Sequence, residues 1–515
     1  MRRKITLLLV LVFFGAFFAS AQKVLYSPFV SSETQTHFEV IGKAGDYYWI
    51  QKNKISFRTK RAKNVFANSE DFNFEVYDER MNPVRTIPFS VSPDVIKEYF
   101  IPGDEFFDQL LFLQEHDQIT ALLNRFSANG DIISSSDTIA SFPARMKYSN
   151  FLLVRSQDKT KILLAGFETV IDSSSKLHSF LYDQNWKPLY HTVYRNVNIS
   201  QPCVQYEFID YPLEHFSNSA IKIANSGEWL MTVPAATSRN FLLFHFRGID
   251  DGFGYKELKF SSSPSVEEII VSLDNVKKDV FTGILSRMRY QTVKNVRIAH
   301  YLLDDRRFDF DTSFRFNTLA ATKTKNENIF EEYFMTVPGK GFMLLKEYGR
   351  SFSSDISEPN NTGNDDTDRN DIEAGTPGYL NRNEYTRYSN LVGGRNSFDR
   401  GDLTMYYFPG TSKDSCWSGI INKQQITEVG SSYLSYVFLP REDRLFFLYN
   451  ELFRNSDQYG NTTVLDQKGN VLDEGVVYWK IKNTLVFQKA RQISENELAI
   501  PYQKNARSGF AIIRL

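Results

Sequence analysis

A polar turn followed by a short apolar run recurs about eight times along this chain, and this pattern constrains its fold more than any other feature. Each run contains four or five leucine, aromatic or β-branched residues, a length typical of a strand and too short for a globular helix. The clearest copies are DKTKILLAG (158–166), SGEWLMTV (226–233), KKDVFTGI (277–284), GKGFMLLK (339–346), REDRLFFLYN (441–450) and SENELAIPY (494–502), while DYYWI (46–50) and FFDQLLFL (106–113) fit more loosely. The recurrence predicts an all-β protein.

A second strand-like run follows each first run after a short interval, and it often ends in an apolar residue, an aspartate and a turn. The clearest copies are FEVYDERMNPV (74–84), SFLYDQNWKPL (179–189) and TVLDQKGNVL (463–472). Asp, Asn, Gly and Pro favour turns because they hydrogen-bond their own backbone or tolerate unusual φ values. Asp78 and Asp183 are 105 residues apart, and Asp183 and Asp304 are 121 apart, so two units fit each interval and one unit has about 52–60 residues.

A unit of this length with about four strands matches the blade of a β-propeller. We therefore predict a single β-propeller over residues 22–515, with eight blades of four antiparallel strands. Seven blades is the close alternative, and two separate β-sandwich domains is the alternative architecture. The last run, GFAIIRL (509–515), is the third strand of a blade that lacks a fourth. We expect KVLYSPFV (23–30) to complete that blade and close the ring, which removes exposed sheet edges.

Residues 1–21 have the features of a secretory signal peptide. A basic start (residues 2–4) precedes an apolar stretch (5–18), and Ala-Ser-Ala at 19–21 is a small-residue cleavage site. The apolar stretch is too short for a membrane-spanning helix, and no later segment is long and apolar enough to be one. The cut before Gln22 resembles the signal peptides of Bacteroidota. We expect an exported protein that is periplasmic, associated with the outer membrane, or extracellular.

The charge balance argues against a nucleic-acid partner. The full chain has 60 basic and 61 acidic residues, and three of the basic ones lie in the signal segment. Nucleic-acid binding requires a basic surface to neutralise phosphates, and this chain has no basic excess. The two cysteines, Cys203 and Cys416, either pair or stay as buried thiols, so the fold does not depend on a disulfide framework.

Residues 350–402 interrupt the repeat, and we predict an irregular, partly disordered insert there. Its first half, residues 354–378, is rich in Asp, Asn, Gly and Thr and has too few apolar residues to fold alone. The acidic run that begins at Asp365 fails the EF-hand spacing, because Asp371 and Pro377 stand where Gly and Glu are required. We therefore expect a solvated acidic loop and no metal site.

The second half of the insert, residues 379–402, alternates tyrosine and arginine. These two residue types anchor many protein interfaces, and tyrosine rings also stack on sugars. Two interpretations remain open: the segment packs on the rim of the ring, or it contacts a partner or ligand. For the second interpretation, the candidate binding residues are Tyr379, Arg382, Tyr385, Arg387 and Tyr388.

The chain carries no recognisable catalytic or cofactor motif. It has no G-x-S-x-G, H-E-x-x-H, P-loop or dinucleotide-binding fingerprint, so we predict no catalytic residue, cofactor or metal. The segment GTSKDSCWSG (410–419) departs from the sialidase Asp box, since it lacks the glycine and its tryptophan comes two residues early. His178, His245 and His300 occupy similar positions in three predicted third strands. Packing is their expected role, and convergence on one site is the alternative.

The segment from Lys413 to Asn450 contains DSCWSGIINKQQITE and SYVFLPREDRLFFLYNE. It resembles the C-terminal part of uncharacterised exported proteins of Bacteroidota that are themselves expected to be propellers. The resemblance covers only the C-terminal part of this chain and implies fold and compartment only. If this region forms a ligand surface, the candidate residues are Trp417, Lys423 and Gln424.

These observations favour a non-catalytic propeller that binds a protein partner or a ligand in the cell envelope. The alternative is a carbohydrate-active enzyme or glycan-binding protein that uses the central funnel of the ring. Catalysis there would require acidic side chains about 5–10 Å apart. We expect no nucleic-acid partner and no transmembrane segment.

Overall fold

The computed structural model describes most of the chain between residues 23 and 514. The described ranges are 23–31, 36–54, 72–89, 94–143, 151–169, 175–197, 221–234, 241–247, 253–258, 265–287, 294–315, 328–337, 341–354, 395–408, 417–423, 425–427, 436–440, 444–451, 459–466, 468–478, 484–487, 490–494, 496–504 and 507–514. Within these ranges, no helix is long and apolar enough to cross a membrane. The predicted signal segment and both cysteines lie outside them.

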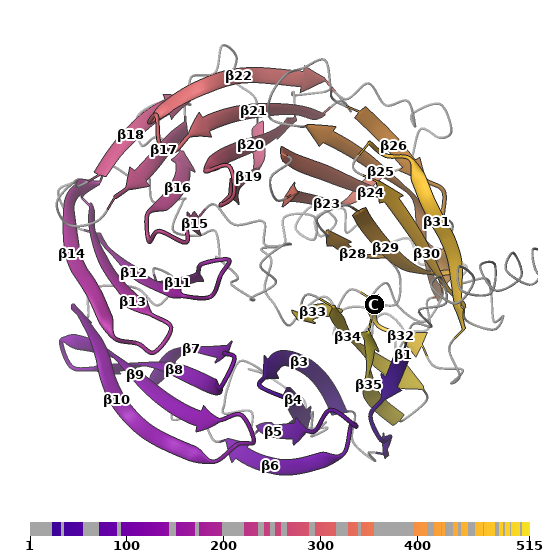
Figure 1. The fold of residues 1–515 in the computed structure, drawn as a ribbon, viewed down its shortest axis with the longest axis horizontal. Coiled ribbons are helices and arrows are strands. Elements are labelled where there is room, and N and C mark those ends of the chain that lie inside the picture. The colour runs from indigo at the N-terminus through magenta and orange to yellow at the C-terminus, as the bar shows by residue number, and fades with distance from the viewer. Residues whose placement is uncertain are drawn as a thin grey trace, which may run out of the picture.

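The strands form eight antiparallel sheets arranged as blades around a central axis, so the protein is a β-propeller (Figure 1). We call the four strands of a blade A to D, from the axis outward. Blades 1 to 4 are β3 (Thr36–Ala44), β4 (Tyr47–Lys54), β5 (Phe72–Tyr77) and β6 (Pro83–Phe89); β7 (Val95–Pro102), β8 (Phe106–Glu115), β9 (Gln118–Ser127) and β10 (Ile132–Pro143); β11 (Phe151–Arg155), β12 (Lys161–Thr169), β13 (Ser175–Asp183) and β14 (Pro188–Val197); and β15 (Ile221–Ile223), β16 (Trp229–Pro234), β17 (Phe241–Phe246) and β18 (Phe253–Leu258).

Blades 5 to 8 complete the circle. They are β19 (Ser265–Asp274), β20 (Asp279–Arg287), β21 (Lys294–Leu302) and β22 (Arg307–Arg315); β23 (Asn328–Val337), β24 (Gly341–Ser354), β25 (Arg395–Phe408) and β26 (Trp417–Ile421), with β27 (Gln425–Thr427) also on β25; β28 (Tyr436–Pro440), β29 (Arg444–Glu451), β30 (Tyr459–Asp466) and β31 (Val471–Tyr478); and β32 (Thr484–Leu485) with β33 (Arg491–Ser494), β34 (Glu497–Lys504), β35 (Arg507–Arg514) and β1 (Lys23–Tyr26), with β2 (Val30–Ser31) also on β35. The prediction of eight blades is confirmed, and the alternatives of seven blades and of two β-sandwiches are wrong.

The ring is closed by the N-terminal strand, as predicted. β1 pairs antiparallel with β35, with Lys23 opposite Arg514, and so becomes the D strand of blade 8. Ser27 secures the end of this strand. Its backbone N–H donates to the Phe510 carbonyl, its hydroxyl accepts from the Phe510 N–H, and its carbonyl accepts from the Tyr502 hydroxyl.

A polar cluster joins blade 8 to blade 1 beside this closure. Glu497 of β34 accepts hydrogen bonds from the Tyr48 hydroxyl (2.9 Å), Arg514 Nε (2.8 Å) and Lys43 Nζ (3.1 Å). Burial alone would raise the pKa of the Glu497 carboxyl, but hydrogen bonds from Lys43, Tyr48 and Arg514 outweigh burial and lower it. Because Lys43 and Tyr48 belong to blade 1, this ionised carboxylate connects the last blade to the first.

The hydrophobic core fills the spaces between neighbouring blades. On β12, Ile162 and Leu164 pack toward blade 2, whereas Leu163 packs toward blade 4. Between blades 1 and 2, the Trp49 ring stacks on Phe107 with centroids 3.8 Å apart. Because both faces of each sheet are covered, the strands have apolar residues at successive positions, and the sequence shows continuous apolar runs.

The strand directions define two faces of the ring. The turns between A and B strands and between C and D strands lie at one end of every blade, which we call the A–B face. The turns between B and C strands and the links between blades lie at the other end, the B–C face. Hydrogen bonds from Asn225 N–H to Asn275 Oδ1, and from Asn275 Nδ2 to Gln157 Oε1, join the A–B turns of blades 3, 4 and 5.

Three C–D turns contain the aspartate that the sequence pattern singled out. Asp78 Oδ1 accepts hydrogen bonds from the backbone N–H groups of Arg80 and Asn82, at 2.8 Å each. Asp183 and Asp466 make the equivalent bonds two and four residues ahead. The residue three positions after each aspartate has a positive φ, as in hairpin loops with a left-handed bulge residue. The predicted turn role of these aspartates is confirmed.

Candidate functional site

Blade 6 extends beyond a regular blade on the B–C face. β24 and β25 have 14 residues each, and residues 349–354 pair with residues 395–400 beyond the region that carries β26. β27 pairs with residues 398–400, which adds a third strand to this extension. We call the three paired segments, residues 349–354, 395–400 and 425–427, the arm. The arm holds the two ends of the predicted insert.

The arm makes the irregular insert shorter than predicted, since residues at both of its ends, 350–354 and 395–402, belong to strands. Their sequences, RSFSS and RNSFDRGD, lack the apolar alternation that would have indicated strands. Residues 355–394 lie outside the described residues. So do six of the candidate binding residues, Tyr379, Arg382, Tyr385, Arg387, Tyr388 and Gln424.

The two remaining candidates, Trp417 and Lys423, are both in blade 6. Trp417 begins β26, opposite Tyr407 of β25. Lys423 lies where the outer strand breaks between β26 and β27, and its side chain is only 1 % exposed. Lys423 Nζ forms an ion pair with Glu347 and donates to Gln425 Oε1 at 3.0 Å. The structure therefore places Lys423 inside the blade, where it bridges strands, and not on a ligand surface.

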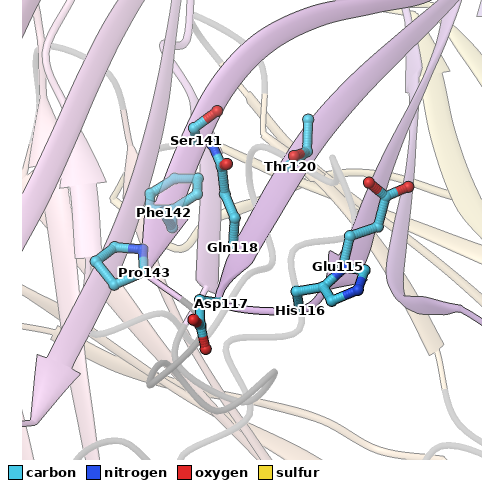
Figure 2. Close-up of a pocket in the computed structure, with 8 residues that line it drawn as sticks. All are labelled: Glu115, His116, Asp117, Gln118, Thr120, Ser141, Phe142 and Pro143. Carbon is cyan, nitrogen blue, oxygen red and sulfur yellow. The ribbon is translucent and has the colours of Figure 1, made fainter.

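A pocket of about 630 Å³ opens on the B–C face of blade 2 (Figure 2). It lies at the tight turn between β8 and β9 and beside the end of β10. Within the turn, His116 has a φ of 49°, a left-handed conformation that is uncommon for a residue with a Cβ. The pocket is lined by Glu115, His116, Asp117, Gln118, Thr120, Ser141, Phe142 and Pro143.

The lining of this pocket is polar and acidic. The described residues that line it supply two carboxylates, an imidazole, an amide and two hydroxyls, and none of these residues is lysine or arginine. Figure 2 shows Gln118 extending toward Ser141 and the carboxylate of Glu115 above the His116 ring, while Asp117 points away from both. Such groups can hydrogen-bond the hydroxyls of an uncharged or cationic ligand, and they repel an anionic one.

Behind the pocket lies a second polar cluster, in blade 3. The ring of Phe142 contacts Phe180 and His178, with centroids 5.2 Å and 6.2 Å away. Glu168 Oε2 lies 3.3 Å from both His178 Nε2 and Lys176 Nζ. Burial alone would raise the pKa of Glu168, but the hydrogen bonds from His178 and Lys176 outweigh it and lower the pKa. This carboxylate is therefore ionised and neutralised within its own blade.

A row of polar side chains, in which Gln109 is buried and Glu98 and Asn124 are partly buried, also crosses blade 2 from its innermost to its outermost strand. Gln109 Nε2 donates to Glu98 Oε1 (2.8 Å), and Asn124 Nδ2 donates to Gln109 Oε1 (2.9 Å). The backbone N–H of Ser136 completes the row by donating to Asn124 Oδ1. Burial raises the pKa of the Glu98 carboxyl to about 7, against the opposing effect of the Gln109 hydrogen bond. Near neutral pH, Glu98 thus changes protonation inside the blade.

We expect Glu98→Gln to stabilise the protein at pH 8 and to change little at pH 4.5. The folded pKa lies above that of the unfolded chain, so the stability of the native protein falls as pH rises from about 4.5 to 7, and the loss persists above that range. The raised pKa of Glu98 therefore lowers the free energy of unfolding of the native protein by roughly 3 kcal/mol at pH 8. Thermal unfolding at both pH values measures this, with the exposed Glu105→Gln as control. An equal shift at both pH values would contradict the assignment.

The three histidines in similar predicted positions do not converge. Each lies beside a carboxylate of its own blade: His178 beside Glu168, His245 with Nε2 3.4 Å from Glu228, and His300 with Nε2 3.4 Å from Asp279. They stand at different distances from the ends of their strands, so their similar positions in the predicted third strands do not become equal heights in the ring. Within the described ranges, no group of three His, Cys, Asp or Glu residues could hold a metal ion.

Comparisons with known proteins do not identify a family for this chain. No protein-family model and no curated protein matches it. Among solved structures, the Dos1 propeller is similar over 96% of this chain and 95% of its own, with 10% identity and a TM-score of 0.41. The polysaccharide lyase Uly1 is similar over 96% and 99% of the two chains, with 8% identity and a TM-score of 0.35. Prolyl oligopeptidase B from Galerina marginata matches 92% of this chain and 56% of its own, at 10% identity and a TM-score of 0.35. These likenesses are too distant to indicate an activity.

Sequence reasoning missed the blade 2 pocket and Glu98. The segment EHDQ (115–118) reads as an ordinary polar hairpin turn, and only the neighbouring end of β10 makes it one wall of a pocket. Glu98 lies in a run of mixed polarity, VIKEYF, that gave no sign of burial.

Proposed function

We propose that this protein is an exported, non-catalytic β-propeller that serves as an interaction platform in the cell envelope and binds its partner through the B–C face. The observation that carries the proposal is the arm of blade 6. Its paired strands continue beyond the blade through residues 349–354 and 395–400, and a third strand supports them. Extra paired backbone of this kind fixes the base of a long segment, which suits the presentation of a binding surface.

The composition of the segment that the arm carries also supports partner binding. Residues 379–388 include three tyrosines and two arginines, the side chains that contribute most to protein interfaces. The signal-like N-terminal segment supports an envelope location for that partner. The pocket of blade 2 opens on the same face, four blades away around the ring from the arm.

Replacing residues 355–394 by an Asn-Gly turn should leave the ring folded and lower partner binding by about tenfold or more, as the loss of an interface hot spot does. The measurement is affinity purification of the tagged protein from crosslinked envelope, read by mass spectrometry. Lys187→Ala combined with Lys468→Ala, on the A–B face, is the control and should keep the partner. Undiminished recovery of the same partner by the shortened protein would overturn the role of the arm.

A second candidate function is glycan binding at the blade 2 pocket. Its carboxylates, amide and hydroxyls suit the hydroxyl groups of a neutral or amino sugar, and none of the described residues that line it is a lysine or arginine that would pair with a uronate or a sulfated sugar. Titration calorimetry with neutral, amino and acidic oligosaccharides tests this. The proposal is supported if a neutral or amino sugar binds and the double variant Glu115→Gln with Asp117→Asn abolishes that binding. It is contradicted if no sugar of the three classes binds.

A further inference from the structure

The core between blades 3 and 4, which are neighbours on the left of Figure 1, contains polar side chains among its apolar ones. Side chains alternate between the two faces of a strand, so Ser179 and Leu181 of β13 both point toward blade 4, where Leu181 is part of the core. In the register of β13 and β14, Thr192 lies opposite Ser179 and Tyr190 lies opposite Leu181, so both belong to the same face. Trp229 of β16 packs into this core from blade 4.

Among the described residues, four polar atoms of this core have no hydrogen-bond partner: Ser179 Oγ, Tyr190 Oη, Thr192 Oγ1 and Trp229 Nε1. All four atoms are shielded from solvent, and Ser179 and Trp229 are 0% exposed as whole residues. Burial raises the pKa of the Tyr190 hydroxyl, while the polar groups of Ser179 and Trp229 act in the opposite direction. These three groups therefore lie near one another, although none has the distance and angle of a direct hydrogen bond.

Comparable groups elsewhere in the ring are paired with protein atoms. The indole N–H of Trp49 donates to the Ala128 carbonyl at 2.9 Å, and the hydroxyl of Tyr182 donates to the Ile139 carbonyl at 2.7 Å. A buried polar group without a partner costs free energy, so native proteins pair nearly all such groups with protein atoms or with ordered water. Four unpaired polar atoms in one core therefore indicate that another hydrogen-bonding molecule belongs there.

We propose that these four side chains bind a water molecule that bridges blades 3 and 4. The indole N–H of Trp229 can only donate, whereas the three hydroxyls can both donate and accept, so together they suit a molecule that donates two hydrogen bonds and accepts two. An N–H group does not ligate a cation, and the four groups carry no charge, so neutral water fits them better than an ion. The bridge joins β13 and β14 to β16, and it is independent of the arm and of the blade 2 pocket.

Ser179→Ala tests the bound water through the direction of its effect on stability. If the Ser179 hydroxyl binds water, its removal should raise the equilibrium constant of unfolding about fivefold, measured by urea denaturation. If the hydroxyl is instead buried without any partner, alanine removes an unfavourable polar group, and the constant stays the same or falls. The second result would overturn the proposal. Ser135→Ala makes the same change at an exposed position of β10 and should leave the constant nearly unchanged.

A double variant shows whether the two strands of blade 3 share the same water. Thr192→Val alone should also raise the equilibrium constant of unfolding. Combined with Ser179→Ala, it should raise the constant by less than the product of the two single effects, because the first change already weakens the binding of the shared water. A combined effect equal to that product would contradict a single water bound by both hydroxyls.

A high-resolution crystal structure, from crystals grown with sodium bromide in place of sodium chloride, gives the direct test. We expect one water within about 3.2 Å of at least three of the four atoms, and no anomalous signal from bromide at that position. A bromide peak there would show an anion site and overturn the proposal. Direct hydrogen bonds among the four side chains, or to another side chain, with no water between blades 3 and 4 would overturn it as well.

Discussion

A chain that begins at residue 32 is expected to lose the stable ring. It lacks β1, whose four residues pair with β35, and Ser27, which bonds to Phe510 and Tyr502. Val24 and Tyr26 pack into the core between blades 7 and 8, and Leu25 packs into the core between blades 8 and 1. Their loss removes roughly 3–5 kcal/mol of apolar burial. Because domains are stable by only about 5–15 kcal/mol, the shortened chain should unfold or aggregate.

Size-exclusion chromatography and thermal unfolding by circular dichroism measure this effect against the chain 22–515. Ser27→Ala offers a graded version, because it leaves the buried Phe510 N–H without its hydroxyl acceptor and should cost about 1–3 kcal/mol. The exposed neighbour Pro28→Ala serves as control and should change stability little. A monomeric chain 32–515 with an unchanged melting temperature would show that β1 does not hold the ring together.

The second large effect is expected for Asp108→Ala, at the contact between blades 2 and 3. Asp108 accepts two hydrogen bonds from Arg125, from Nε at 2.8 Å and Nη2 at 2.9 Å, and a third from Trp186 Nε1 at 2.7 Å. The carboxylate is 7% exposed and the arginine side chain 14%. Removing the acid leaves a buried guanidinium and an indole N–H without this partner, which costs about 3–5 kcal/mol.

Urea unfolding, followed by tryptophan fluorescence, measures the change for Asp108→Ala. Asp131→Ala is the matched control, because it breaks an ion pair with Arg85 whose side chains are 43% and 57% exposed. Exposed pairs contribute about 0–1 kcal/mol, so this variant should stay close to the parent. Equal losses of unfolding free energy for the two variants would contradict the inference that the Asp108–Arg125 pair stabilises the protein more because it is buried.

The fold followed from the sequence because its determinants are local and repeated. A turn aspartate such as Asp78 fixes a hairpin through bonds to residues two and four ahead, and the same signal recurs at Asp183 and Asp466. The missing fourth strand after residues 509–515 and the spare strand at 23–30 together predicted the closure. The extension of β24 and β25 was missed because polar strands in a projecting hairpin carry no apolar period.

The candidate site was much less accessible from the sequence. Lys423 was a plausible surface residue in the sequence, and only a break in the outer strand of blade 6 places it beside Glu347 inside the sheet. The pocket of blade 2 brings together the turn at 115–118 and the strand end at 141–143, which are well separated along the chain. The two segments are close because the turn after β8 and the end of β10 reach the same height in the blade. The amino-acid composition of the strands does not predict where each strand ends. Six of the candidate binding residues stay predictions.

The central claim is that the first and last strands close an eight-bladed ring, and disulfide trapping tests it most directly. Val24 lies opposite Ile513 in the register of β1 and β35. In a chain whose Cys203 and Cys416 are replaced by serine, Val24→Cys with Ile513→Cys should form a disulfide on mild oxidation, identified as a crosslinked peptide by mass spectrometry. Val24→Cys with Val84→Cys, which places the second thiol in blade 1, should not. Absence of the 24–513 crosslink in the folded protein, or equal crosslinking of both pairs, would contradict closure by the N-terminal strand.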